Sequence, residues 1–241
     1  MTSEPKVAVI TGASRGIGAA LVGAYRDIGY HVVASSRSIG RSDDPSTLAV
    51  DGDIASAKTA DRIVGLAIER FGRIDTLINN AGLMLGRVNS LEASDEHVQA
   101  VIDLNARSII WVTRAAAPWL ERQGGFVTNT TSIGARNGGA GGAIIYAAAK
   151  GFVSTITKGH AKELIGKKIR VNAVSPGVIT TPFHERYTDA DALEVIRQTI
   201  PIARLGTAEE CVGAYLFLAS EALRAYVVGQ IIEVNGGQLM P

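Results

Sequence analysis

The sequence predicts an α/β fold, in which a parallel sheet is covered by helices on both faces. Short apolar, β-branched runs alternate with amphipathic segments along the chain, and the first run, residues 6–10, passes directly into a glycine-rich turn. Strands buried on both faces form such continuous apolar runs, and alternating strands and helices give parallel pairing. No proline-rich, serine-rich or charged linker divides the 241 residues. We therefore expect one domain.

The bulk composition argues against several kinds of partner. The net charge is only +1, which gives no electrostatic reason to bind nucleic acid or an anionic membrane. No apolar run approaches the ~20 residues that a membrane helix needs. Cys211 is the only cysteine, which indicates a reducing compartment, and the four histidines are too scattered for a zinc site. We expect a soluble cytoplasmic protein that binds no metal.

The turn at 11–18 reads Thr-Gly-Ala-Ser-Arg-Gly-Ile-Gly and lies between the first strand and a helix at 19–28. Glycines in this setting let the backbone approach a pyrophosphate at the helix N-terminus. The spacing of Gly12, Gly16 and Gly18 differs from the G-x-G-x-x-G pattern of larger dinucleotide domains. Close packing alone would also explain these glycines, so the turn leaves both interpretations open.

The second predicted strand, at 31–35, ends without an acidic residue, because the chain continues Ser-Arg-Ser at 36–38. A site for NAD usually places an acid here, whereas an arginine suits the 2′-phosphate of NADP. Arg37 and Arg15 both offer guanidinium groups to such a phosphate. The sequence therefore favours NADP over NAD, and a solvated loop position is the alternative for each arginine. The polar segment at 38–46 is too broken for a helix.

The third strand, at 47–50, is followed by Asp53-Ile54. An acid just past a strand can accept a hydrogen bond from an adenine amino group, or it can cap the next helix. That helix, at 60–71, has apolar residues at helical spacing. The fourth strand, at 74–79, runs into Asn-Asn-Ala-Gly at 79–82, at the edge where open α/β sheets bind ligands.

One long helix is predicted from about 95 to 121. Asn105 lies seven residues after Val98, on the apolar face of this helix. A buried amide must find hydrogen-bond partners. Asn105 is therefore either a satisfied core residue or part of a polar site.

The rest of the chain continues the alternation. The predicted elements are a strand at 126–130 ending in Thr131-Ser132, a flexible glycine-rich loop at 134–142, a helix at 146–165, a strand at 169–174, a partly helical flap at 183–200 and a strand at 230–234. Thr207 and Glu210 have the spacing of a capping box, and the helix that they begin is expected to bury Cys211.

Tyr146 and Lys150 begin the helix at 146–165 and lie on one face, one turn apart. An ammonium group near a phenol favours the phenolate and lowers the tyrosine's pKa from its ordinary value near 10. The pair can therefore act as an acid and the group that adjusts its pKa. Taken alone, this spacing is more often ordinary helix surface.

Together these segments resemble the classical short-chain dehydrogenase/reductase family. The matching segments follow the family's order: 11–18, 53–54, 79–82, 104–105, 131–132, 146–150, 176–182 and 234–237. The resemblance implies a single-domain, doubly wound Rossmann-type sheet of about seven parallel strands. It divides the chain into a cofactor half at about 1–130 and a catalytic and substrate-binding half at about 131–241. It also implies a nicotinamide cofactor and a homotetramer or homodimer.

The resemblance assigns catalysis to four residues. Tyr146 would protonate the carbonyl oxygen as hydride arrives, and Lys150 would lower the tyrosine's pKa and hold the nicotinamide ribose. Ser132 would hydrogen-bond the substrate oxygen. Thr131 is an alternative, because Tyr146 lies 14 residues after Ser132, one more than the commonest family spacing. Asn105 would anchor a water that relays protons past Lys150.

Further positions are carried over for the cofactor and the substrate. The cofactor positions are Gly12, Ser14, Arg15, Gly16, Ile17, Gly18, Arg37, Asp53, Ile54, Asn80, Ala81, Gly82, Tyr146, Lys150, Pro176, Gly177, Ile179 and Thr181. Substrate specificity is expected from 83–87, 134–145 and the flap, with Ser132, Phe183, His184 and Tyr187 as candidate contacts. The flap has no strongly basic cluster that would argue for an acyl-carrier partner.

These assignments predict an oxidoreductase that transfers hydride between NADP(H) and a carbonyl or secondary alcohol substrate. One alternative is an NAD-dependent alcohol or sugar dehydrogenase with the same catalytic residues. Another is a non-enzymatic regulator that binds a dinucleotide. Regulators on this fold typically lack the tyrosine or the lysine, and both are present here.

Overall fold

A computed structural model describes residues 4–240 and contains one sheet of seven parallel strands in the order β3-β2-β1-β4-β5-β6-β7. The strands are β1 Val7–Thr11, β2 His31–Ser36, β3 Thr47–Asp51, β4 Thr76–Asn79, β5 Phe126–Thr130, β6 Arg170–Pro176 and β7 Ile231–Val234. The strand order reverses between β1 and β4, which is the switch point of a doubly wound sheet. The predicted fold class and the number of strands are confirmed.

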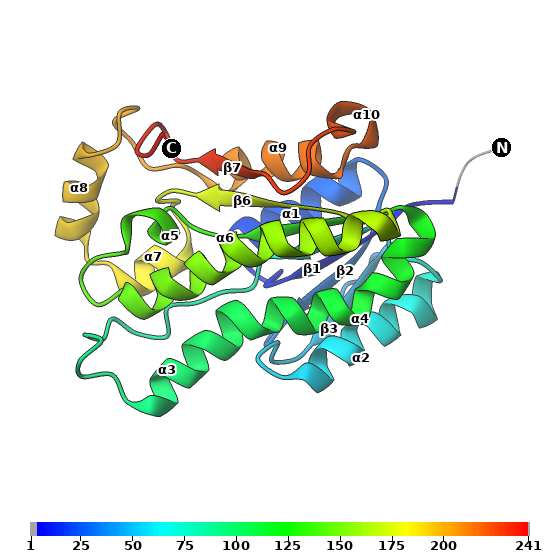
Figure 1. Ribbon diagram of the computed structural model, residues 1–241, viewed down its shortest axis with the longest axis horizontal. Helices are drawn as coiled ribbons and strands as arrows, with labels where there is room; N and C mark the ends of the chain where they lie inside the picture. The colour runs from blue at the N-terminus through cyan, green and yellow to red at the C-terminus, as the bar shows by residue number, and fades with distance from the viewer. Residues whose placement is uncertain (1–3, 241) are drawn as a thin grey trace.

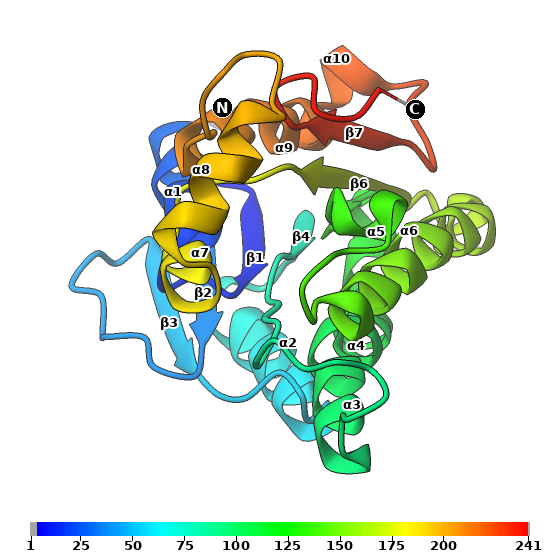
Figure 2. The same cartoon turned by 90° about the vertical axis from the view of Figure 1, so that its left-hand side faces the viewer.

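Helices cover both faces of this sheet (Figure 1). They are α1 Gly16–Asp27, α2 Ala57–Phe71, α3 Asp95–Ile102, α4 Ser108–Gln123, α5 Gly134–Asn137, α6 Ile144–Leu164, α7 Pro182–Tyr187, α8 Ala190–Gln198, α9 Ala208–Ala219 and α10 Glu221–Arg224. Figure 2 shows α2, α4 and α6 on one face and α1 and α9 on the other. No helix within residues 4–240 is long and apolar enough to cross a membrane.

The core lies in two layers, one on each side of the sheet. Along β1, Val7 and Val9 pack into the layer under α2 and α4, whereas Ala8 and Ile10 pack into the layer under α1 and α9. Side chains of a strand alternate between the two faces of a sheet, so a strand buried on both faces must be apolar throughout. This requirement explains the continuous apolar run at the start of the sequence.

All seven strands point toward the same edge of the sheet, where α5, α7 and α8 lie (Figures 1 and 2). The turns that follow β1, β4, β5 and β6 therefore meet at that edge. The segments at 11–18, 79–82, 131–132 and 176–182 follow these four strands, whereas Arg37 follows β2 and Asp53 follows β3.

Two predicted elements differ from the observed ones. The helix expected from about 95 to 121 is α3 and α4, joined by a π-helical turn at Asp103–Arg107. The loop expected at 134–142 contains the short helix α5, closed by hydrogen bonds such as Ala135 N to Ser132 O at 2.9 Å. Both differences lie beside the candidate site. The segment at 38–46 is free of helix, as expected.

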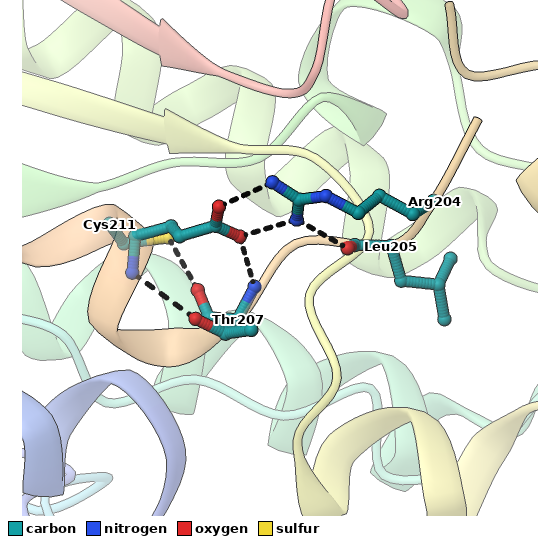
Figure 3. A network of polar contacts seen from close by, with 5 residues as sticks. Arg204, Leu205, Thr207 and Cys211 are labelled. Carbon is teal, nitrogen blue, oxygen red and sulfur yellow. Dashed lines mark hydrogen bonds and ion pairs between the residues drawn. The ribbon is translucent and has the colours of Figure 1, made fainter. Parts of the chain in front are cut away.

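The predicted capping box is confirmed at the start of α9. Glu210 N donates to Thr207 Oγ1 at 3.4 Å, and Thr207 N donates to Glu210 Oε2 at 2.9 Å. Arg204 donates to both carboxylate oxygens, at 2.6 and 2.8 Å, and Figure 3 shows it facing Thr207 across this network. The hydrogen bonds from Arg204 lower the pKa of Glu210 to about 2. Cys211 is buried in the core, as expected.

Candidate active site

A cavity of about 1090 Å³ opens at the carboxyl edge of the sheet. Every residue that the sequence assigned to the cofactor lines this cavity, and so do Ser132, Phe183 and His184. Two assigned residues, Asn105 and Tyr187, do not line it. The structure thus brings together residues from both halves of the chain.

The glycine turn after β1 is held against the end of β4. A Cβ on Gly18 would lie 2.1 Å from Gly12 O, so only glycine fits there. Thr11 Oγ1 accepts hydrogen bonds from the backbone N–H groups of Asn80 and Ala81, both at 3.1 Å. The Asn80 side chain donates to Thr11 O and Gly12 O at 3.1 and 3.2 Å. The Asn80 amide therefore holds the turn itself.

The start of α1 fits an anionic group. Its N-cap residue, Arg15, makes no capping hydrogen bond with its side chain, and the first turn contains no acidic residue. The first N–H groups of a helix have no partner within the helix and carry partial positive charge. Gly16, Ile17 and Gly18 line the cavity at this point. A dinucleotide pyrophosphate is the kind of ligand that such a terminus accepts.

Two arginines mark one end of the cavity. Arg15 and Arg37 are exposed, and within residues 4–240 neither guanidinium group has a hydrogen bond or an ion pair. Asp53 also lines this end, but its carboxylate accepts from Ala55 N at 3.0 Å. The N-cap residue of α2 is Ser56, so the capping alternative for Asp53 is wrong.

Tyr146, Ser132 and Lys150 meet at the other end of the cavity. The Tyr146 hydroxyl is hydrogen-bonded to Ser132, whose Oγ also accepts from Gly134 N at 3.1 Å. Lys150 Nζ donates to Thr130 O at 2.8 Å and lies 5.7 Å from the centre of the Tyr146 ring. A phenol, a hydroxyl and an ammonium group thus surround one space.

Burial controls the ionisation of this pair. It raises the pKa of Tyr146 to about 12, an effect that the hydrogen bond from Ser132 partly offsets. Burial also lowers the pKa of Lys150 to about 8. The tyrosine's pKa therefore moves in the direction opposite to that predicted from the Tyr-Lys spacing. A phenol that stays protonated at neutral pH is suited to donate a proton.

The geometry separates Ser132 from its neighbour Thr131. Thr131 Oγ1 donates to Lys150 O at 2.9 Å and lies 2.8 Å from Ser154 Oγ. The hydrogen-bond partners of the threonine hydroxyl are therefore both in α6. The serine hydroxyl contacts Tyr146 instead. The arrangement favours Ser132 as the group that would meet a substrate oxygen.

Asn105 is fully buried in the π-helical turn between α3 and α4. Its amide donates to Leu83 O at 2.8 Å and Val101 O at 2.9 Å, and its Oδ1 accepts from Leu83 N at 3.1 Å. A Cβ on Gly82 would lie 2.7 Å from Asn105 Oδ1 and 2.9 Å from Lys150 Nζ. Asn105 is thus a satisfied core residue that borders Lys150 from behind the cavity wall.

Aromatic rings from α7 cover Tyr146. The Phe183 ring lies 5.5 Å from the Tyr146 ring, 5.2 Å from His184 and 5.3 Å from Tyr187. Tyr187 was expected to contact the substrate. It packs against Phe183 instead and does not line the cavity. Burial, and then the nearby charge of Arg87, lowers the pKa of His184 to about 4. His184 is therefore neutral at physiological pH.

Residues 12–238 match the family model described as enoyl-(acyl carrier protein) reductase. The chain is 37% identical to the 3-oxoacyl-[acyl-carrier-protein] reductase of Synechocystis sp., with 98% of this chain and 97% of that protein covered. This chain belongs to the short-chain dehydrogenase/reductase family. The predicted family is thus confirmed, and the chain is an oxidoreductase of that family.

Solved structures of this family share the fold closely. An NADH-dependent reductase A1-R′ complexed with NAD is 34% identical, with a TM-score of 0.87 over 99% of this chain and 98% of that chain. The 3-ketoacyl-(acyl-carrier-protein) reductase of Brucella melitensis complexed with NADH is 30% identical, with a TM-score of 0.88 and 98% of each chain covered. Both relatives are named for reduction and carry a nicotinamide dinucleotide.

Some residues that line the cavity of this short-chain dehydrogenase/reductase were not among those assigned to the site from the sequence. Thr11 accepts hydrogen bonds from Asn80, and Thr130 O accepts one from Lys150, and no local pattern reveals these contacts. Gln238 lines the cavity from the end of the chain, and no signal in the sequence marks it. Among the described residues, no group of three or more His, Cys, Asp or Glu is placed to hold a metal ion.

Proposed function

We propose that the chain reduces a carbonyl group to a secondary alcohol with NADPH, and catalyses the reverse oxidation with NADP. One observation carries this proposal. Tyr146, Ser132 and Lys150 converge at one end of a cavity whose other end has an uncapped helix N-terminus and two unpaired arginines. That is the layout required to hold a dinucleotide beside a proton donor.

The chain's own residues fit each part of the cofactor. When bound, the nicotinamide ring supplies or accepts the hydride. The glycine turn and the N-terminus of α1 would hold the pyrophosphate, and Lys150 would hold the nicotinamide ribose. The backbone at Ile179, together with Thr181, would hold the carboxamide. Both of these residues line the cavity.

Tyr146 would donate its proton to the substrate oxygen in reduction and take the proton back in oxidation. Ser132 would hydrogen-bond the same oxygen and stabilise the charge that develops on it. The raised pKa of Tyr146, about 12, keeps the phenol protonated before the reaction and supports the reductive direction. Asn105 would fix the loop after β4 so that Gly82 stays beside Lys150.

The preference for NADP rests on Arg15 and Arg37. Both border the cavity where β2 ends, and neither is engaged by an acid within residues 4–240. A 2′-phosphate dianion would receive charge-assisted hydrogen bonds from both guanidinium groups. The competing proposal is an NAD-dependent enzyme, which the relatives bound to NAD and NADH favour.

The test follows oxidation of NADPH and NADH with a panel of ketones, 3-oxoacyl thioesters and ketoses, and the reverse reaction with secondary alcohols. We expect a higher kcat/KM with NADPH; a higher value with NADH would favour the competing proposal. Tyr146→Phe should lower kcat by roughly 10²- to 10⁴-fold while NADPH still binds. Unchanged turnover would contradict the assigned role, and NADPH binding without turnover of any substrate would indicate a regulator.

The wider organisation forms part of the same proposal. The division at about residue 130 places the glycine turn in one half and Tyr146 in the other. A homotetramer or homodimer would bury the exposed Ile144 and Phe152 of α6. Analytical ultracentrifugation checks the assembly, and a monomer at micromolar concentration would contradict it. A cytoplasmic location is checked by fractionating cells that express the chain.

A further inference from the structure

Arg87 joins three segments around the substrate end of the cavity. Its Nη1 donates to the carbonyl oxygens of Ala140 and Gly141, both at 2.9 Å. Its Nη2 donates to Thr188 Oγ1 at 3.0 Å, and its Nε donates to the carbonyl oxygen of Tyr187. One guanidinium thus connects the loop after β4, the loop between α5 and α6, and the junction of α7 and α8.

All four acceptors are neutral, and Arg87 has no ion pair with any residue that the structure describes. A guanidinium has five N–H donors in a rigid plane, and four of them are used here. Hydrogen bonds from a charged donor are stronger than neutral ones. Three of the acceptors are backbone carbonyls, so the side-chain entropy that these contacts cost comes mainly from Arg87 itself. Loss of this one guanidinium would remove all four hydrogen bonds together.

The contact with Thr188 leads to the catalytic tyrosine. Thr188 Oγ1 lies 3.3 Å from Nδ1 of His184, which lines the cavity. Phe183 packs between His184 and Tyr146. The centre of its ring lies 5.2 Å from that of His184 and 5.5 Å from that of Tyr146. Arg87 is therefore linked through Thr188 to His184, which lines the cavity. From His184 the contacts continue through Phe183 to Tyr146.

The flap, residues 183–200, depends on such contacts because the segment that carries it leaves and rejoins the fold at one place. Thr180 N donates to Gly206 O at 2.8 Å, and Gly206 N donates to Val178 O at 3.1 Å. These bonds close the base of the segment, and its later part is held at Thr199 by Gln238 Nε2 and at Ile202 by Gly236 O. Arg87 supplies hydrogen bonds to the junction of α7 and α8, at 187–188.

The opposite loop is shaped to receive Arg87. Val88 N donates to Gly142 O at 3.1 Å. Gly142 has φ +77°, and a Cβ there would lie 2.9 Å from the carbonyl carbon of Arg87 and 2.8 Å from Val88 N. Only glycine permits this approach of the two backbones. The contact surface for Arg87 is therefore built into both loops.

We propose that Arg87 is a positioning residue that holds the flap against the loops at 83–88 and 139–142, and so sets the affinity for the carbonyl substrate. The holding of the flap is a property of the free protein. The effect on substrate affinity rests on the proposed function.

Hydrogen–deuterium exchange on the full-length, ligand-free protein tests the first part. Arg87→Met keeps most of the side-chain stem but removes every donor, and it should speed exchange of backbone amides in 184–198 by roughly tenfold. Arg87→Lys keeps the charge without the planar fork, and it should also speed exchange there. Amides of α6 at 150–160 should keep their wild-type rates in both variants.

The matched control is Arg186→Met. Arg186 also lines the cavity, but its guanidinium lies over the Tyr187 ring at 5.5 Å and, within the part of the chain that the structure describes, joins no second segment. Flap exchange in this variant should stay within about twofold of wild type. Unchanged flap exchange in Arg87→Met would overturn the proposal, and so would an equal increase in Arg186→Met. If Arg87→Met does not fold, Thr188→Val removes one acceptor and must raise flap exchange in the same region.

Steady-state kinetics test the second part. Arg87→Met should raise KM for the carbonyl substrate by roughly tenfold, with kcat within about threefold and KM for NADPH unchanged. An equal loss in kcat and no change in substrate KM would overturn the link to substrate affinity. If the wild-type protein turns over no substrate, the proposed function fails, whereas the exchange measurement still decides whether Arg87 holds the flap.

Discussion

The substitution Gly82→Ala would place one methyl group between two buried side chains, those of Asn105 and Lys150. The added Cβ would lie 2.7 Å from Asn105 Oδ1 and 2.9 Å from Lys150 Nζ. Ordinary carbon–oxygen contacts are about 3.3 Å or longer, so at least one of these groups must move by roughly 0.5 Å. Both are fixed, Asn105 by three hydrogen bonds and Lys150 by its bond to Thr130 O.

The strain should appear more in activity than in stability. Overpacking of this size costs about 1–3 kcal/mol, which lowers the thermal midpoint by roughly 4–8 °C for a loss of about 2 kcal/mol. A catalytic group displaced by about 1 Å can lose about 10²-fold in rate, so we expect Gly82→Ala to lower kcat by roughly 10- to 100-fold. In the proposed mechanism the reaction depends on where the amino group of Lys150 lies, whereas we expect the fold to tolerate its displacement.

The assay measures kcat at saturating NADPH and substrate, at least 15 °C below the thermal midpoint of each variant. Gly65→Ala is the control, because Gly65 is exposed within α2 and a Cβ there would meet nothing within 4 Å. That change should leave kcat unaltered and stabilise the protein by about 0.5–1 kcal/mol. If Gly82→Ala keeps kcat within about threefold of wild type, the placement of Lys150 is not critical and the reasoning is wrong.

Three further outcomes are expected. Because burial lowers the pKa of Lys150 to about 8 in the folded protein, below its ordinary value of about 10.4, the unfolded chain binds this proton more tightly. The free energy of unfolding of wild type relative to Lys150→Met should therefore rise by roughly 2 kcal/mol between about pH 8 and about pH 9.5 in urea titrations, and a constant difference would contradict the shift. Ser132→Ala should lower kcat by roughly 10²- to 10³-fold, whereas Thr131→Val should lower it less than tenfold while destabilising the fold by about 1–2 kcal/mol; the reverse ranking would make Thr131 the substrate-binding hydroxyl. Arg37→Ala should raise KM for NADPH by roughly 10- to 100-fold and leave KM for NADH nearly unchanged, and equal changes for both would argue against a 2′-phosphate contact.

The sequence pattern predicted the helices and strands well in segments whose residues are all buried or all share one requirement. The strands of the sheet centre are apolar on both faces, and the glycine turn after β1 needs a conformation that few other residues adopt, so both are visible in sequence. The π-helical turn at Asp103–Arg107 was missed because the apolar periodicity continues through it. Asn105, within this turn, is hydrogen-bonded to Leu83 in another segment, a contact that the local sequence does not reveal. The short helix α5 was missed for a similar reason, since a glycine-rich segment has low helix propensity.

The pairing of Tyr146 and Lys150 was evident from a spacing of four residues, because a helix fixes which residues share a face. The glycine turn, the arginines near the end of β2 and the segments after β4 and β6 were evident for a related reason. A parallel sheet brings the carboxyl ends of its strands to one edge. The sequence by itself therefore determined the fold class, the place of the cavity and most of its lining.

The tertiary structure alone decided what those residues experience. Burial moves the pKa of Tyr146 upward rather than downward, and α6 engages the hydroxyl of Thr131 and leaves Ser132 for the cavity. Arg87 acquires its acceptors from residues 53 and 101 positions further along the chain. Dehydration, charge and hydrogen bonding depend on which atoms are within a few ångströms, and for these residues those atoms come from distant segments that no local pattern specifies.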